Sequence, residues 1–239
     1  PTPGGGTPVN RTLNAGAARV YGAELEFNYA PRSIEGLSFQ FSAAYTHARL
    51  LAFGDAPCYG GQTFAMGCNQ LFTPSANQAV PGAGAITVDG VSGFYRAQDL
   101  GGTPMVRAPK WQVNFGFAYD MPLENGWTLS FTNTSQYSSR YLTTPGRRAD
   151  FYAPSYFKTD FGLAVKGAED RWEVAFIGKN LTNRITASSC TSSNVANGTN
   201  FGGQITGGGI GGPAGIDEVG CYADRGRELW LRLTLRPFN

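Results

Sequence analysis

The stretch that decides the fold is Arg19–Tyr29, which reads RVYGAELEFNY. Apolar and polar residues alternate along it, and this period of two predicts a β-strand with one apolar face and one polar face. The apolar face carries Tyr21, Ala23, Leu25, Phe27 and Tyr29, and the polar face carries Gly22, Glu24, Glu26 and Asn28. Soluble strands usually run about five or six residues, whereas a tilted strand needs about 9–11 residues to cross the hydrocarbon of a membrane. The length of this stretch, 11 residues, favours a strand that crosses a membrane.

Outward from this strand, the same alternation recurs along the rest of the chain. The further predicted strands cover 37–49, 109–119, 127–141, 157–166, 172–177 and 229–236. Their connections alternate between short turns, at 31–36, 121–126 and 167–171, and longer loops, at about 50–107, 142–156 and 184–225. Antiparallel strands place successive connections at opposite ends, so the sequence predicts one trimmed end and one elaborated end. Outer-membrane β-barrels have this asymmetry, with short periplasmic turns and long extracellular loops.

Tyrosine and tryptophan gather at the ends of the predicted strands, whereas phenylalanine and aliphatic residues fill the middles. Tyr29, Tyr119 and Trp127 lie toward the short turns, and Tyr45, Trp111 and Tyr137 lie toward the long loops. Rings with a polar tip belong at the two interfaces of a bilayer. A soluble β-sandwich or propeller also alternates, but its strands are shorter and its loops more even. The sequence therefore favours a membrane barrel.

Composition agrees with this interpretation. Charged residues make up 15% of the chain and aromatic residues 13%, and no run of about 18 apolar residues offers a transmembrane helix. The net charge is only +2 with scattered basic residues, so nucleic acid is not expected as a partner. The predicted strands fall short of the roughly eight in the smallest transmembrane barrels. We therefore expect residues 1–239 to be the C-terminal part of one larger barrel domain, with 1–16 extracellular and the C-terminus periplasmic.

The sequence offers no catalytic or metal-binding constellation. Its one histidine, His47, lies on an apolar face near a strand end, with no partner in the sequence that would orient it as a base. A Cys-x-x-Cys pair is missing, so a zinc site is poorly supplied. The glycines of 207–212 lack the lysine and helix of a phosphate-binding loop. We expect no enzymatic activity, no metal and no cofactor.

The four cysteines fall as one pair in each long loop. Cys58 and Cys68 share the first loop, and Cys190 and Cys221 share the second. We expect disulfides within the loops, Cys58 with Cys68 and Cys190 with Cys221, although reduced structural cysteines are an alternative. On the chain-entropy model, these closures would contribute roughly 3 and 4 kcal/mol. They would stiffen loops that stand in water without a core.

Aromatic residues of the loops are the candidate substrate contacts, because rings supply large contact areas. They are Tyr59, Phe64, Phe72, Phe94, Tyr95, Tyr152 and Phe201. Charged residues on the polar faces have a simpler explanation, as the polar wall of a water-filled lumen. They are Glu24, Glu26, Lys158, Asp160, Lys166, Glu173, Lys179, Arg232 and Arg236.

Four segments resemble the TonB-dependent outer-membrane receptor family. NAGAARVYGAELE at 14–26 is similar to that family's strand opening N-x-G-x-x-x-x-x-G-x-E-x-E, and APKW at 108–111 is similar to its A-P-K/R strand entry. GKNLTN at 178–183 resembles the G-x-N-L-x-[DN] element, and GRE at 226–228 resembles the opening of the closing strand. Each motif is weak alone, but all four occur in the family's order.

The resemblance implies an all-β fold, an antiparallel transmembrane barrel of 22 strands of which this chain supplies about seven, without the N-terminal plug. It also implies TonB-dependent import of a large scarce nutrient, a ferric siderophore or similar molecule, across the bacterial outer membrane. The implied partners are outer-membrane lipid, the nutrient, and TonB through the plug. A passive porin-like channel, a barrel enzyme and an adhesive or structural barrel are the alternatives. The end departs from the family pattern, since Pro237 breaks the alternation and Asn239 follows Phe238.

Overall fold

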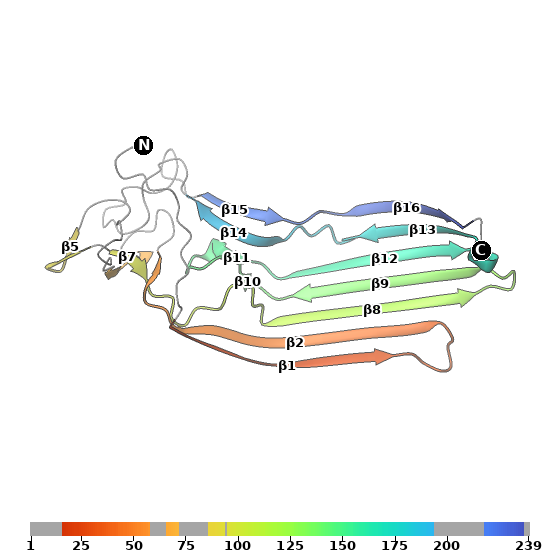
Figure 1. Cartoon of the computed structure of the whole chain (residues 1–239), viewed down its shortest axis with the longest axis horizontal. Coiled ribbons are helices and arrows are strands. Elements are labelled where there is room, and N and C mark those ends of the chain that lie inside the picture. Colours follow the sequence, from red (N-terminus) through yellow and green to blue (C-terminus); the bar gives the residue numbers. More distant parts are fainter. Residues whose placement is uncertain (1–15, 58–65, 72–85, 94, 194–217, 237–239) are drawn as a thin grey trace.

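The main feature of the chain is an antiparallel sheet of seven long strands in the order β1-β2-β8-β9-β12-β13-β16 (Figure 1). The strands are β1 (Ala17–Tyr29), β2 (Leu37–Ala52), β8 (Trp111–Pro122), β9 (Thr128–Ser138), β12 (Tyr156–Lys166), β13 (Trp172–Lys179) and β16 (Glu228–Leu235). This computed structural model describes residues 16–57, 66–71, 86–93, 95–193 and 218–236. Each predicted strand corresponds to one strand of the sheet, and the predicted all-β antiparallel class is confirmed.

Several strand boundaries differ from the prediction. The predicted strand 127–141 is shorter in the structure, because β9 ends at Ser138 and Tyr141 lies in a separate short strand, β10 (Tyr141–Leu142), which pairs with β11 (Tyr152–Ala153). β13 extends two residues beyond the predicted 172–177, and β16 has the predicted length of 8 residues. β13 ends where Asn180 adopts a left-handed φ of 48°, which turns the backbone out of the sheet.

The long connections are less irregular than the sequence suggested. They contain β3 (Ala56–Pro57), β4 (Gln70–Leu71), β5 (Ile86–Val88), β6 (Val91–Gly93), β7 (Tyr95–Gln98), β14 (Ala187–Ser193), β15 (Glu218–Ala223) and a 3-10 turn, η2 (Ala149–Phe151). Figure 1 shows β5, β7, β10, β11, β14 and β15 gathered at one end of the sheet. At the other end, turns containing Gly36 and Gly126, both at φ 78°, and the 3-10 turn η3 (Ala168–Asp170) join the strands. The predicted difference between the two ends is therefore present.

The apolar face of the sheet is continuous from strand to strand. In register, Phe39 lies opposite Phe117 and Phe41 opposite Phe115. This face does not pack on a core, since Phe115 is 40% exposed and Leu231 78% exposed. The buried hydrophobic cluster, Leu142 and Phe151, lies in the elaborated connections and not beneath the sheet. The apolar face therefore needs an apolar environment outside the chain.

The helices give no membrane span: within the described ranges, none is long and apolar enough to cross a bilayer.

In the middle of the sheet, three polar side chains interrupt the apolar face. Asn133, Ser135 and Thr159 lie on this face by strand parity, on β9 and β12. Asn133 Nδ2 donates to Thr159 Oγ1 at 2.9 Å, and Ser135 Oγ donates to Asn133 Oδ1 at 3.1 Å. Because these groups satisfy one another, their cost in an apolar environment is much lower than that of unpaired polar groups.

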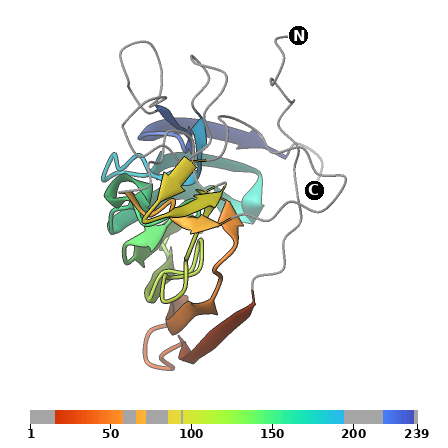
Figure 2. The same cartoon turned by 90° about the vertical axis from the view of Figure 1, so that its left-hand side faces the viewer.

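The sheet is curved across its width, as the end-on view of Figure 2 shows from β1 to β16. Its polar face carries a concavity lined by side chains of β1, β2, β8 and β9. The apolar face is therefore convex and the polar face concave, as in the wall of a barrel.

Candidate functional site

The concave face is a polar surface built by alternation along the four strands that line it. Its hydrogen-bonding side chains are those of Glu26, Asn28, Gln40, Ser42, Asn114, Thr132 and Thr134. Asn114 Nδ2 donates to Ser42 Oγ at 3.2 Å, which links β8 to β2. Such a surface can hold water or a polar solute. It has no nucleophile held beside a base.

Toward the short-turn end, charges of this face are paired between strands, once across neighbouring strands (β13 and β16) and once across β9, from β12 to β8. Arg232 donates to Glu173 at 2.7 Å, and the Glu173 residue is 8% exposed. Lys166 lies 3.8 Å from Asp120 Oδ1, which also accepts a hydrogen bond from Ser130 Oγ. Since opposite charges face each other across strands, this part of the wall is close to neutral.

Toward the loop end, Asp160 connects β12 to the end of β13. Its Oδ2 accepts from Lys179 Nζ at 2.9 Å, and its Oδ1 accepts from the backbone N–H of Asn180 at 2.7 Å. The second bond satisfies a backbone donor at the point where β13 leaves the sheet. Asp160 thus fixes the place where the second long loop begins.

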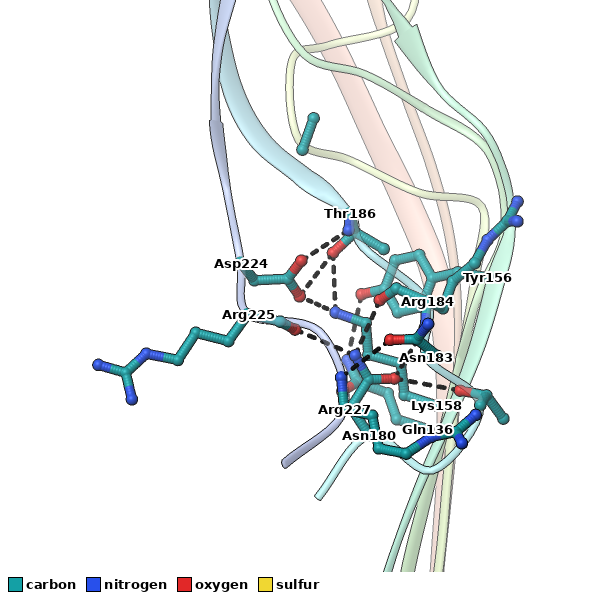
Figure 3. Close-up of polar contacts among 12 residues, drawn as sticks. Gln136, Tyr156, Lys158, Asn180, Asn183, Arg184, Thr186, Asp224, Arg225 and Arg227 are labelled. Carbon is teal, nitrogen blue, oxygen red and sulfur yellow. Dashed lines mark hydrogen bonds and ion pairs between the residues drawn. The ribbon is translucent and has the colours of Figure 1, made fainter. Parts of the chain in front are cut away.

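A polar network lies at the base of that loop (Figure 3). Asp224 accepts from the backbone N–H of Thr186 at 2.6 Å and from its hydroxyl at 2.9 Å, and it forms an ion pair with Lys158. Lys158 Nζ also donates to Thr186 Oγ1 at 2.9 Å. Both ends of the loop are thereby tied to β12, one through Thr186 and the other through Asp224.

Asn180 is the second anchor of the same loop base. The residue is 8% exposed, and its Nδ2 donates to the carbonyls of Arg184 and Arg225, each at 3.1 Å, while its Oδ1 accepts from Arg184 N–H at 3.0 Å. Asn183 Oδ1 accepts from the N–H of Arg227 at 3.0 Å. In Figure 3 the side chain of Arg225 extends away from this network. The GKNLTN segment therefore closes the loop through its two asparagines.

The three elaborated connections also contact one another. Arg147 donates from Nε to the carbonyl of Asp99 at 3.0 Å and from its guanidinium to the carbonyl of Gly101 at 2.6 Å. The hydroxyl of Tyr141 donates to the carbonyl of Ala187 at 2.8 Å. Desolvation by burial raises the pKa of Tyr141, so this hydroxyl stays protonated as a donor. The loop end is thus one linked layer in the described residues.

Of the predicted substrate contacts, the side chain that the structure describes is that of Tyr152. This residue is half-buried, packs against Leu142 and Phe151, and stacks under Arg140, whose guanidinium carbon is 3.9 Å from the ring centroid. Tyr95 lies at the start of β7, and nothing further is described of it. Tyr59, Phe64, Phe72, Phe94 and Phe201 lie outside the described residues. The predicted aromatics are therefore not brought together by the structure as described.

Cys190 and Cys221 form a disulfide, as partners directly opposite each other in the β14–β15 hairpin, with their Cα atoms 4.1 Å apart. Cys68 is buried and disulfide-bonded, and Cys58 lies outside the described residues. Within the described residues, no group of three or more His, Cys, Asp or Glu could hold a metal ion.

The sequence pattern did not predict the anchoring role of Asn180, Lys158, Thr186 and Asp224. Asn180 and Asn183 could have indicated part of this role from sequence, because they flank a tight turn. Asparagine tolerates the left-handed backbone conformation and forms hydrogen bonds to nearby backbone groups. Both adopt it, at φ 48° and 52°. The pairing of Lys158 with Asp224 had no signal, because the two residues are far apart in sequence.

Comparison with known proteins agrees with this geometry. The family model described as "TonB dependent receptor-like, beta-barrel" matches residues 1–181. Among solved structures, the ferric yersiniabactin uptake receptor FyuA from Yersinia pestis is similar, with a TM-score of 0.53 and 11% identity over 90% of this chain. At this identity the likeness shows the fold alone, and the chain spans 23% of that receptor's length. No curated protein sequence matches.

The match to the family model covers well over half of the chain, and the fold likeness covers nearly all of it. The resemblance to this family is thus confirmed by an independent comparison. The chain belongs to the family of TonB-dependent outer-membrane receptors, and its seven long strands are part of the β-barrel of such a receptor.

Proposed function

We propose that the receptor to which this chain belongs imports a large scarce nutrient, a ferric siderophore or similar molecule, in a TonB-dependent manner. The observation that carries the proposal is the concave polar face, whose side chains pair or bond with one another while the convex face is apolar. This is the arrangement of a barrel that encloses a wet lumen within lipid. The family match and the fold of FyuA, an uptake receptor for a ferric siderophore, support it.

In this proposal the linked loop layer faces the outside of the cell, and the short turns face the periplasm. Substrate would first meet the loop aromatics, which we propose to be Tyr59, Phe64, Phe72, Phe94, Tyr95, Tyr152 and Phe201. The polar wall then lines the route inward, and TonB acts through the plug domain of the receptor. The disulfide and the anchored loop base would hold the loop layer in place during uptake.

Uptake by intact cells tests the proposal. A strain that lacks the receptor is supplied with a panel of ⁵⁵Fe-labelled ferric siderophores, with and without the full-length gene on a plasmid. We expect one class to accumulate only in the complemented strain, and accumulation to stop when TonB is deleted or a protonophore collapses the proton gradient. Uptake that persists without TonB would contradict the proposal and favour a passive porin-like channel, which would also conduct ions steadily in a planar bilayer.

A further inference from the structure

A pair of arginines lies on the convex face at the loop end of β1 and β2. In register, Arg19 lies directly opposite Arg49, and both share strand parity with the apolar residues Tyr21 and Tyr45. Both are exposed. The two guanidinium groups therefore extend from the side of the sheet that the family's barrel turns toward lipid.

The close approach of two guanidinium groups on this face is electrostatically unfavourable unless an anion binds between them. Like charges directly opposite each other across antiparallel strands repel. Within the described part of the chain, no salt bridge joins Arg19 or Arg49 to a carboxylate. Along the same row, the next partner of Arg49 is Pro104, which carries no charge. The pair thus presents two positive charges side by side with nothing described to neutralise them.

The neighbours of the pair set its depth in the membrane. One step toward the sheet centre, the rings of Tyr21 and His47 stack with centroids 4.7 Å apart, and next to them Tyr45 and Trp111 lie 4.8 Å apart. Such a band of amphipathic rings marks the interface between hydrocarbon and headgroups. The arginines lie immediately beyond that band, at the level of the lipid headgroups.

We infer that Arg19 and Arg49 form a binding site for a phosphate of an outer-leaflet phosphorylated glycolipid. Guanidinium groups bind phosphate through paired, charge-assisted hydrogen bonds, and two of them on adjacent strands can hold one phosphate from both sides. The inference rests on the proposed orientation, which places this end of the barrel in the outer leaflet. It assigns a lipid contact to the receptor wall, apart from the substrate route.

Lipid binding to the purified full-length receptor tests the inference. The receptor in detergent is titrated with bisphosphorylated lipid A, and bound lipid is counted by native mass spectrometry. We expect Arg19→Gln with Arg49→Gln to weaken binding roughly tenfold or more. The matched control is Lys110→Gln with Arg225→Gln, which removes two charges from the same end of the sheet and should change binding less than about twofold.

Titrations with other lipids and with inorganic phosphate identify which chemical group is bound. Dephosphorylated lipid A should bind weakly and equally to wild type and variant. Unchanged binding in the arginine variant, an equal loss in the control, or an equal loss for phosphatidylglycerol would each overturn the inference. If inorganic phosphate at millimolar concentration abolished binding, the site would be one for free anions and not for lipid.

Folding is checked by the heat-dependent gel shift typical of barrels. If the double variant does not fold, the single changes Arg19→Gln and Arg49→Gln replace it, and each should weaken binding about threefold. Because no nutrient is present, this result is independent of the uptake experiment. A receptor that binds the glycolipid but fails in uptake would count against the proposed function alone.

Discussion

The side chain of Asn180 forms three hydrogen bonds with backbone groups at the base of the loop. Its amide donates to the carbonyls of Arg184 and Arg225, and its oxygen accepts from Arg184 N–H. The residue is nearly buried and lies at a left-handed φ. Any replacement therefore changes both hydrogen bonding and backbone preference at the loop base.

We predict that Asn180→Asp destabilises the receptor by roughly 2 kcal/mol, because two backbone carbonyls lose their donor and face a negative charge. Hydrogen exchange of residues 184–193 and 218–227 should accelerate, while the exchange of β8 and β9 stays unchanged. The control is Asn183→Asp, an exposed position with a similar φ, where the side chain only accepts a bond and keeps it. Equal acceleration in both variants would refute the anchoring role.

Tyr141 allows a pH test of the contact between loops. Desolvation raises the pKa of its hydroxyl, so the folded state favours the neutral donor. A group with a raised folded pKa contributes its full stability below the unfolded value of about 10, and loses it as pH rises through the folded value. We expect Tyr141→Phe to cost about 1 kcal/mol at pH 7, and the difference from wild type to shrink above pH 10, in chemical unfolding curves. A difference that grew with pH would contradict this.

At the scale of the strand, Gly22 of β1 allows the chain to approach β2 closely. A Cβ atom at this position would collide with the backbone carbonyl oxygen of Tyr45. The obstacle is backbone and cannot rotate away as a side chain would. This gives a steric reason for the second glycine of the strand-opening motif.

We predict that Gly22→Val separates β1 from β2 near the loop end and lowers the yield of folded receptor, as measured by the heat-dependent gel shift. Ala23→Val, the adjacent position on the apolar face, adds the same kind of side chain where it can point outward. That variant should fold as wild type does. Equal yields of the two variants would show that the close approach does not matter.

Long strands could be predicted from sequence because each shows its period over many residues, as Arg19–Tyr29 does. The short strands of the loops could not, since two or three residues display no period and pairing depends on distant partners, as between β14 and β15. The residues of the candidate site, too, could be predicted only where the signal was local in sequence. The loop aromatics can be proposed as substrate contacts from residue type alone. The hydrogen bond between Asn180 and Arg225 joins the two ends of a long loop, so no local sequence pattern predicts it.

At the scale of the whole molecule, the sheet has its apolar surface on the convex side and most of the charges of its strands on the concave side, with Arg19 and Arg49 as exceptions. Leu231 is 78% exposed in the middle of β16, whereas the nearby Glu173 on the polar face is almost buried. In water this arrangement would be unstable, because a large apolar patch would remain solvated. In a lipid bilayer the same arrangement is favourable, because the apolar face contacts the hydrocarbon.

We predict that Leu231→Lys destabilises the full-length receptor in phospholipid vesicles by roughly 2–4 kcal/mol, because a charge would enter the hydrocarbon. Thr234→Lys is the control, since Thr234 lies on the polar face opposite Glu173, where a lysine stays out of the hydrocarbon. Urea unfolding followed by tryptophan fluorescence measures both. Similar losses in the two variants would mean that the convex face does not contact lipid.

The bond between Cys190 and Cys221 closes a hairpin that belongs to one connection of the barrel. It crosslinks no two long strands, so it can form before the sheet assembles or after, without trapping a wrong strand order. The geometry of this pair therefore imposes no order on oxidation and membrane insertion. When oxidation comes first, the machinery that inserts the strands has to accept a loop that is already closed.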